Sequence, residues 1–426
     1  MSATVNGSYY EATAPRPPAA PALSGRHEAE VCVIGVGFAG LATALGLVER
    51  GVRDVLLLEA ERVAFGASGR NGGFVFAGYS LDCANLLAQL GPDRARECYA
   101  LTCDALNLIR RRIAEHVIEC DAVEGGALLA NWFDDERILL RQQALMRDHF
   151  GAEWQLIGRD AMAAHLVSAR YHGALREPDA FHFHPLKYAL GLARVLASAG
   201  VRLHEHSAAT SLTPIAGGGF RVATARGAVR AREVVLAGGG YLAGLAPRLE
   251  RAMLPIATYV MATEPLGSEA ARLVPSGAAI YDTRFAFDYY RRLADTRLLW
   301  GGRISVRDRS PAAIARFLRG DMARVYPSLA DARIDFAWSG LMSYARHKMP
   351  QIGRLQPGLW FASSFGGHGV APTTVAGEAL AEAITGGAPL PPAFERYGLA
   401  RTFGRLGLAA AQATYGWLQF RDWLRG

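Results

Sequence analysis

Apolar residues along this chain form short continuous runs, which alternate with longer stretches where they recur every three or four positions. The run at 29–34 ends at a glycine and predicts a buried parallel strand. The stretch 38–50 has helical spacing and stops at Gly51, and 54–58 predicts a second strand. This strand–helix–strand order is typical of a dinucleotide-binding βαβ unit.

The rest of the pattern predicts a mixed α/β chain. Helices are expected within 84–117 and near 134–149 and 185–199, and short strands at 126–130, 201–204, 208–213, 219–224 and 233–237. Between 250 and 345 the apolar runs become longer, more strand-like and richer in aromatic residues. A strand at 360–364, a glycine loop and a helix at 376–384 then repeat the order seen near the N-terminus.

Three glycines separate the first strand from the first helix. Gly35, Gly37 and Gly40 form a G-x-G-x-x-G pattern, which permits a tight turn, close approach of a pyrophosphate and close packing of helix on strand. The N–H groups at the helix start attract phosphate. Glu59 follows the second strand, 19 residues past Gly40, where a carboxylate accepts the adenosine ribose hydroxyls. The pattern predicts a dinucleotide site without separating FAD from NAD.

Two later segments favour FAD. The small-residue loop GASGRNGG at 66–73 directly follows the second strand, where a nicotinamide enzyme would usually continue with another strand and helix. Such a loop can lie against the pyrophosphate and the flavin ring. The segment 363–386 is a second glycine loop that opens a helix, and a helix N-terminus stabilises negative charge on the pyrimidine end of a reduced flavin.

These motifs resemble the D-amino-acid-oxidase-like family of FAD-dependent oxidoreductases, and within it the γ-glutamylputrescine oxidase branch. The resemblance runs over nearly the whole chain. It includes SYYEATAP at 8–15, HP at 184–185, VVLAGGGYL at 234–242, YYRRLADTRLLWGGR at 289–303, MPQIG at 349–353 and ATYGWLQFRDWL at 413–424. It implies an α/β fold in which a Rossmann-like FAD-binding domain of the glutathione-reductase type adjoins an α+β substrate domain containing an antiparallel sheet.

The resemblance also implies domain boundaries. The FAD-binding domain is expected at 28–118, 160–246 and 345–390, the substrate domain at 119–159 and 246–344, an N-terminal extension at 1–27 and a helical C-terminal tail at 391–426. The expected cofactor-binding residues are Gly35, Gly37, Phe38, Ala39, Gly40, Glu59, Ala60, Arg62, Ser68, Gly69, Arg70, Asn71, Gly72, Gly73, Ala209, Ala237, Gly238, Gly239, Gly367, His368, Gly369 and Val370.

The flavin is expected to be bound non-covalently. Some relatives attach it through a cysteine in the segment that aligns with 341–345. Here that segment reads LMSYA, and no cysteine follows Cys120. A histidyl link remains an alternative.

Candidates for the chemistry come from the same segments. His368 lies in the second glycine loop and is expected at the flavin edge, or to cap the loop. Tyr259, Tyr290 and Tyr344 are candidate catalytic residues and, with Tyr289 and Trp338, could line a pocket for a cationic substrate; alternatively they belong to the core. Lys348 could promote oxygen reduction or lie in an exposed turn. His182 and His184 are interpreted as structural residues.

The resemblance implies oxidation of an amine C–N bond to an imine. The imine hydrolyses to an aldehyde and an amine or ammonia, and O₂ is reduced to H₂O₂. Relatives that oxidise amino acids carry a basic residue after GHG, but Val370 and Ala371 follow that motif here. We therefore expect an amine whose reacting carbon bears no carboxylate, unless Arg284, Arg291, Arg303 or Arg346 binds one. One alternative is an amino-acid or imino-acid dehydrogenase that reduces a quinone or carrier; another is a flavin-bearing RNA-modifying module.

Composition argues against a nucleic-acid-binding, disulfide-stabilised, zinc-binding or membrane-spanning protein. The formal charge is +7, but 44 of the 46 basic residues are arginines spread along the chain, and Lys187 and Lys348 are the lysines. Without a basic run, nucleic-acid binding is not expected. The five cysteines lack CxxC spacing, which excludes a disulfide framework or zinc site and favours a reducing cytoplasm. No signal peptide or spanning segment is expected, so we predict a cytoplasmic protein without integral membrane association.

Overall fold

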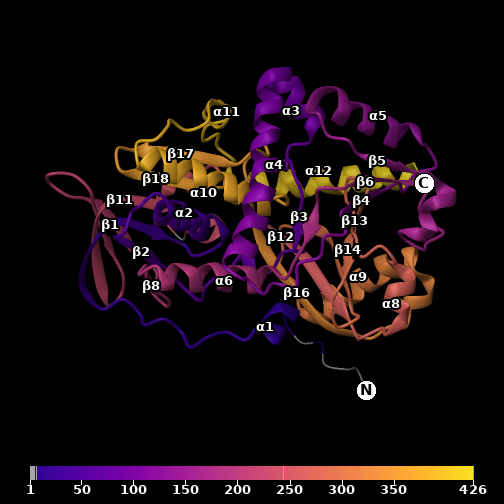
Figure 1. Ribbon diagram of the computed structural model, residues 1–426, viewed down its shortest axis with the longest axis horizontal. Coiled ribbons are helices and arrows are strands. Elements are labelled where there is room, and N and C mark those ends of the chain that lie inside the picture. Colours follow the sequence, from indigo (N-terminus) through magenta and orange to yellow (C-terminus); the bar gives the residue numbers. More distant parts are fainter. Residues whose placement is uncertain (1–4, 6, 243, 426) are drawn as a thin grey trace.

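The computed structural model describes residues 5, 7–242 and 244–425 (Figure 1). Two large sheets lie side by side. The first has the order β17-β18-β11-β1-β2-β8, with β10 pairing to β11 and β9 to β10. Its strands are β1 (Gly25–Ile34), β2 (Val55–Leu58), β8 (Arg202–His204), β9 (Ser211–Pro214), β10 (Phe220–Ala223), β11 (Gly227–Leu236), β17 (Gln351–Gln356) and β18 (Leu359–Ser363). This sheet contains the predicted βαβ unit.

Strand β1 is buried on both faces because helices cover one side of the sheet and further chain covers the other. Val31 and Val33 belong to the core beneath the helices, whereas Cys32 and Ile34 belong to the core on the opposite face. Neighbouring strands β11 and β2 run parallel to β1. The continuous apolar run in the sequence reflects this double burial.

The helices against this sheet match the predicted pattern. They are α2 (Phe38–Glu49), α4 (Pro92–Glu115), α6 (Pro185–Ser198) and α10 (Val370–Ile384), and α3 (Cys83–Leu90) packs against α4. The buried Arg112 of α4 joins three of them, since its guanidinium bonds Glu49 of α2 at 2.7 Å and Glu378 of α10 at 2.5 Å. Helices α2 and α10 also meet closely, because a Cβ atom at Gly377 would lie 2.5 Å from the Cβ of Ala42.

The second sheet has the order β16-β12-β15-β14-β13-β4-β6-β5 and is mainly antiparallel. Its strands are β4 (Ala127–Ala130), β5 (Gln155–Ile157), β6 (Ala174–Glu177), β12 (Leu254–Thr263), β13 (Ala279–Asp282), β14 (Tyr289–Arg292), β15 (Leu298–Ser305) and β16 (Ile334–Tyr344). Helix α9 (Pro311–Val325) packs on one face and shares its core. A two-stranded ladder of β3 (Phe74–Val75) and β7 (Phe181–His182) lies apart from both sheets.

One expected boundary needs correction. The segment 160–246 was assigned to the FAD-binding domain, but β6 pairs antiparallel with β4 and therefore extends the second sheet. After β6 the chain passes through β7 and α6 and then returns to the first sheet at β8. The four residues of β6 are too few to reveal from their pattern which sheet the strand joins.

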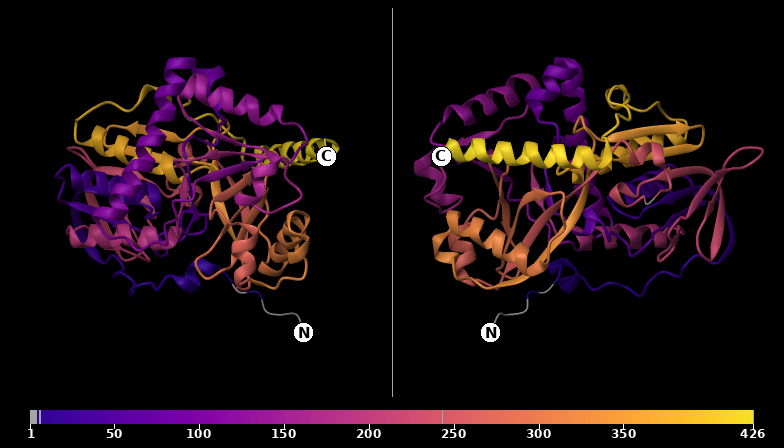
Figure 2. Two further views of the ribbon diagram at one scale, coloured as in Figure 1. Left: turned by 45° about the vertical axis from the view of Figure 1, so that its right-hand side comes forward. Right: turned by 180° about the vertical axis from the view of Figure 1, so that it is seen from behind.

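The remaining segments run over the surface. They include the α-helices α1 (Tyr9–Thr13), α5 (Arg137–Leu145), α7 (Pro247–Glu250), α8 (Ser268–Leu273), α11 (Pro392–Glu395) and α12 (Gly404–Leu424), and the short turns of 3₁₀ or π helix at Ala67–Gly69, Met146–Phe150, Arg159–Ala164, Gly239–Tyr241 and Pro327–Leu329. Residues 14–24, part of the expected N-terminal extension, form an extended arm between α1 and β1. Helix α12 crosses the outside of the second sheet as a long straight rod, drawn yellow in Figure 2.

Alanine substitution at two helix glycines is predicted to change stability in opposite directions, because Gly377 lies in the contact between α2 and α10 whereas Gly320 lies in open space on α9. We expect Gly377→Ala to lower the free energy of unfolding by about 2 kcal/mol, since the added methyl meets backbone atoms of Ala42 and Thr43 that cannot yield. Gly320→Ala in α9 meets nothing within 4 Å and should raise stability by about 1 kcal/mol through helix propensity. Urea unfolding of the two flavin-loaded variants tests this, and equal stability would contradict the packing argument.

Candidate active site

The first glycine loop lies at the carboxyl end of β1. Gly35 has φ +99°, and a Cβ atom there would lie 2.8 Å from the carbonyl carbon of Ala237. A Cβ atom at Gly37 would lie 2.8 Å from the Oγ of Ser68. These positions admit only glycine, and they leave the backbone N–H groups at the start of α2 open to a ligand.

Glu59 ends β2 beside this loop. Its carboxylate accepts hydrogen bonds from the N–H of Val36 at 2.7 Å and of Glu61 at 3.1 Å. Burial raises the pKa of Glu59, while these N–H donors oppose that shift. The carboxylate is therefore held where the sequence pattern expects the acceptor for ribose hydroxyls.

The loop 66–73 is fixed to both sheets. The Oγ of Ser68 accepts the N–H of Phe38 at 2.8 Å, which fastens the loop to the start of α2. The indole N–H of Trp338 in β16 donates to the carbonyl of Arg70 at 3.0 Å. A Cβ atom at Gly72 would lie 2.7 Å from the ring of Tyr289 in β14. The loop thus separates the nucleotide end of the first sheet from the second sheet.

Two polar side chains of the loop act mainly on the loop itself. The amide of Asn71 donates to the carbonyls of Ala67 at 3.1 Å and Ser68 at 2.8 Å, and its oxygen accepts the N–H of Gly73. The guanidinium of Arg70 donates to the carbonyls of Phe65 at 2.8 Å and Ser339 at 3.2 Å. The side chains of Asn71 and Arg70 therefore fix the backbone conformation of the loop that would contact the cofactor.

The second glycine loop meets the end of β16. A Cβ atom at Gly366 would lie 2.6 Å from the ring of Tyr344, and one at Gly367 would lie 2.9 Å from its hydroxyl. The Oγ of Ser80 accepts the N–H of His368 at 3.2 Å. Tyr344 and His368 are therefore brought together at the N-terminus of α10, as the sequence suggested.

His368 is a neutral residue in this position. Burial lowers the pKa of its imidazole to about 4. Its Nε2 lies 3.2 Å from the carbonyl oxygen of Phe76, and its ring lies 3.9 Å from the Phe76 ring between centroids. Since the nitrogen facing a carbonyl must carry the proton, Nδ1 is the unprotonated nitrogen.

The other expected cofactor residues lie in several separate segments. Phe38, Ala39 and Gly40 begin α2, and Gly69 lies in the loop 66–73. Ala237, Gly238 and Gly239 follow β11, and the first two approach Gly35, while Gly369 and Val370 begin α10. Ala60 follows Glu59, and Ala209 lies half-buried against the core under β10.

Arg62 differs from the expectation. Its guanidinium donates to Glu205 at 3.0 Å and to the carbonyl of Pro17 at 2.8 Å. These bonds hold the N-terminal arm against the first sheet. The side chain is committed to that structural contact, which the sequence alone could not show because its partners are 45 and 143 residues away.

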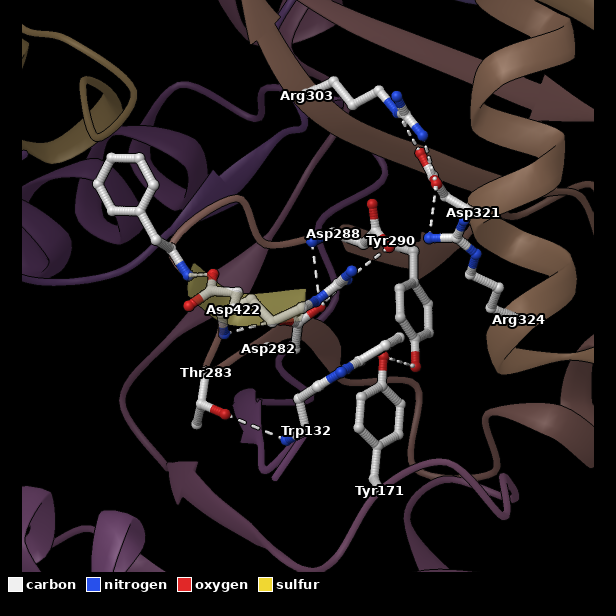
Figure 3. Close-up of polar contacts among 12 residues, drawn as sticks. Trp132, Tyr171, Asp282, Thr283, Asp288, Tyr290, Arg303, Asp321, Arg324 and Asp422 are labelled. Atoms are coloured by element: carbon white, nitrogen blue, oxygen red, sulfur yellow. Dashed lines mark hydrogen bonds and ion pairs between the residues drawn. The ribbon is translucent and has the colours of Figure 1, made fainter. Parts of the chain in front are cut away.

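Two expected catalytic tyrosines, Tyr290 and Tyr259, lie in the core instead, and Figure 3 shows the first of them. Tyr290 is fully buried, stacks on Trp300 with centroids 4.2 Å apart, and places its hydroxyl 3.4 Å from that of Tyr171. Tyr259 is buried in the same core and donates to the carbonyl of Arg307 at 2.5 Å. Neighbouring strand residues point to opposite faces, so Tyr289, rather than Tyr290, faces the loop 66–73.

Lys348 also departs from the catalytic expectation. It lies in an exposed turn with φ +63°, between β16 and β17. Its ammonium lies 5.8 Å from the ring of Phe285. This placement corresponds to the exposed-turn interpretation of the residue.

Sequence reasoning missed most of an aromatic cluster near His368. Rings contact one another in a closed circuit, with centroid distances from 5.6 to 6.4 Å. The members of this aromatic cluster are Phe74, Phe76, Tyr281, Phe287 and Tyr289. Phe287 is 41% exposed and Phe76 and Tyr281 are half-buried, so the cluster borders open space. The alternation in FVF, directly after GASGRNGG, was the available signal.

A buried carboxylate lies behind this cluster. The hydroxyl of Tyr281 donates to Glu177, which is 4% exposed. Burial raises the pKa of Glu177 to about 7, so its ionisation falls near neutral pH. The pair adds negative potential to the aromatic cluster when Glu177 is ionised.

The arginines that could replace the missing carboxylate clamp are largely engaged (Figure 3). Arg284 bonds Asp282 and Asp288, both at 2.6 Å, and Arg303 bonds Asp321 at 2.5 Å. Arg291 is buried, and it donates to the carbonyls of Gly72 at 2.7 Å and Phe183 at 2.8 Å. Arg346 is exposed after β16.

Among the residues that the structure describes, no group of three or more His, Cys, Asp or Glu side chains could hold a metal ion. Over the same part of the chain, no helix has the length and apolar character needed to cross a bilayer.

A glycine-rich nucleotide loop on parallel strands, joined to a second glycine loop beside an antiparallel sheet, defines a two-sheet flavoprotein. The family model for FAD-dependent oxidoreductases of the DAO type matches residues 30–383. The chain belongs to this family, and FAD is its cofactor. The close approaches at Gly35 and Gly37 and the carboxylate of Glu59 fit the nucleotide.

Relatives support the same assignment. A γ-glutamylputrescine oxidoreductase of Escherichia coli is 36% identical over 393 residues, which are 91% of each chain. A probable oxidoreductase, OrdL, of Haemophilus influenzae is 35% identical over 86% of this chain and 85% of its own. Glycine oxidase from Geobacillus kaustophilus has a TM-score of 0.73 at 22% identity, covering 88% of this chain and 99% of its own. That last likeness confirms the fold.

Non-covalent attachment of FAD stays a prediction. The five cysteines are free and lie between positions 32 and 120, and burial raises the pKa of Cys83 to about 12, which disfavours a reactive thiolate. Acid precipitation should release the yellow flavin into the supernatant. A yellow pellet after washing would show a covalent link and contradict this account.

Proposed function

We propose that the protein oxidises the C–N bond of an amine whose reacting carbon bears no carboxylate, giving an imine. Water hydrolyses the imine to an aldehyde with release of ammonia or an amine. FAD, when bound, would supply the acceptor for the two electrons that the amine loses, and O₂ would reoxidise it with formation of H₂O₂. The observation that carries this proposal is the aromatic cluster beside His368, together with the bonds that already engage Arg284, Arg291 and Arg303.

The cofactor would be held by both glycine loops and the residues between them. The N–H groups at the start of α2 and the carboxylate of Glu59 suit the adenosine diphosphate half. Residues 237–239 suit the diphosphate side, and the loop 66–73 and residues 367–370 suit the flavin half. The N-terminus of α10 stabilises negative charge placed next to Gly367.

The aromatic cluster suits an amine in both protonation states. Ring faces attract the ammonium form during binding, and their apolar surface favours the neutral amine that reacts. Neutral His368 adds no positive charge that would repel the ammonium. Ionised Glu177 behind Tyr281 strengthens the attraction. Together these groups orient a cationic amine without binding an α-carboxylate.

The bonds that the arginines already make within the protein disfavour binding of an α-amino acid. Burying a carboxylate without a cationic partner costs several kcal/mol. Arg284, Arg291 and Arg303 would have to leave existing bonds to provide one. A distal carboxylate, as on a γ-glutamylated diamine, could reach the exposed Arg346. The name of the Escherichia coli relative agrees with such a substrate.

The competing function is a dehydrogenase that reduces a quinone or carrier. One solved relative is an L-proline dehydrogenase from P. horikoshii, with a TM-score of 0.72 at 20% identity. Oxygen uptake with and without an artificial acceptor separates the two functions. Rapid uptake without the acceptor is the outcome that the oxidase proposal requires.

The substrate class is tested by comparing kcat/KM in an oxygen-uptake assay. γ-Glutamylputrescine and a simple polyamine are compared with sarcosine, pipecolate and D-alanine. We expect at least a tenfold preference for an amine without an α-carboxylate, because the clamp is absent. A tenfold preference for an α-amino acid would contradict the proposal.

A matched pair of variants locates any carboxylate contact. Arg346→Gln should raise KM for γ-glutamylputrescine several-fold while changing KM for a polyamine little. Arg354→Gln is the control, because that guanidinium lies 5.2 Å from the Trp360 ring in the first sheet. An equal effect of both substitutions would remove Arg346 from substrate recognition.

A further inference from the structure

Helix α12 is held to the second sheet by one face only. The hydroxyl of Tyr415 accepts the N–H of Ile304 at 3.1 Å, and the carboxylate of Asp422 accepts the N–H of Phe285 at 2.7 Å. Tyr415 and Asp422 are both 6% exposed. These contacts, seven residues apart, fix which side of the helix faces outward.

The outward side is apolar over most of its length. Trp417 is 63% exposed, Trp423 73% and Leu406 78%. The exposed apolar positions are Leu406, Ala409, Ala410, Ala413, Gly416, Trp417, Phe420, Trp423 and Leu424. At about 100° per residue they fill an arc of roughly 140°. An apolar surface of this continuity marks an interaction site.

The charged side chains on the outward face of α12 are all positive. Arg405 and Arg421 are exposed on opposite flanks of the apolar arc. Asp422 is the acidic residue of α12, and it is buried against Phe285. The exposed side therefore combines two indoles and a phenyl ring with flanking cations and presents no carboxylate.

We propose that α12 docks this protein on an anionic lipid surface, with the helix axis parallel to the membrane plane. Indole and phenyl rings insert at the headgroup boundary, and arginines on both flanks contact lipid phosphates. The inner face stays bonded to the protein, so the helix lies on the bilayer without entering it fully.

A second copy of the chain fits this surface less well. Two paired α12 helices would gather four arginines from positions 405 and 421, and neither helix has an exposed carboxylate to balance them. An apolar arc of about 140° is also wider than the two-position seam of a coiled coil. An anionic membrane satisfies both the charge and the width.

The test uses FAD-loaded protein and vesicles of phosphatidylglycerol and phosphatidylcholine in equal parts. We expect co-sedimentation at low salt, at least tenfold weaker binding to pure phosphatidylcholine, and weakening as salt is added. Tryptophan fluorescence should shift to the blue on binding. Absence of co-sedimentation with the anionic vesicles overturns the proposal.

The triple variant Trp417→Ser/Phe420→Ser/Trp423→Ser should lose at least tenfold in vesicle binding while keeping its flavin and its unfolding temperature. Leu140→Ser is the matched control, because Leu140 is 42% exposed on a different helix, α5, and its loss should leave binding unchanged. Arg405→Gln/Arg421→Gln should weaken binding to anionic vesicles alone. Undiminished binding of the triple variant contradicts the proposal.

Light scattering of the unmodified protein examines the alternative occupant. A dimer that the triple variant abolishes, together with no vesicle binding, would assign the surface to a second copy and overturn the membrane proposal. None of these readouts depends on which amine is oxidised, so the outcome is independent of the proposed function.

Discussion

The structure depends on the close approach between the loop 66–73 and the ring of Tyr289. Gly72 lies where any larger residue would collide with that ring, so the loop backbone can reach the second sheet. On its other side, Ser68 bonds the start of α2. This loop therefore sets the distance between the nucleotide end of the first sheet and the aromatic surface of the second, and the proposed reaction depends on that distance.

The same approach explains why the members of the aromatic cluster come from both halves of the chain. Phe74 and Phe76 follow the loop directly, whereas Tyr281, Phe287 and Tyr289 come from the second sheet and its connecting loop. They form one cluster because the loop brings the sheets together. The acidic partners of Arg284 and Arg303 hold nearby positive charge in ion pairs. An aromatic surface with neutralised arginines is suited to a cationic amine.

The nucleotide half of the fold could be predicted from sequence because its signals are local. A buried strand, three glycines, a helix and Glu59 occur within 35 residues, and each constrains its neighbour. The substrate half could not be predicted to the same depth. Tyr289 and Tyr290 are adjacent and chemically alike, and only the pairing of β14 with β15 decides which faces the loop. Arg62 and Glu177 have partners more than 100 residues away, which no local pattern reveals.

The surroundings of the second glycine loop could be predicted only in part. His368 and Tyr344 were both expected near the flavin, and the structure brings them together at the start of α10. Lys348, only four residues after Tyr344, lies in an exposed turn because the chain reverses there with a positive φ. Proximity in sequence to Tyr344 therefore does not bring Lys348 to the second glycine loop.

The most direct measurement is the absorbance of the bound flavin when amines are added without oxygen. Polyamines, γ-glutamylated amines, amino acids and cyclic imino acids can be screened in turn. The account predicts rapid bleaching by at least one amine that lacks an α-carboxylate, with colour restored by air. Bleaching by α-amino acids alone, or by none of these compounds, would contradict it.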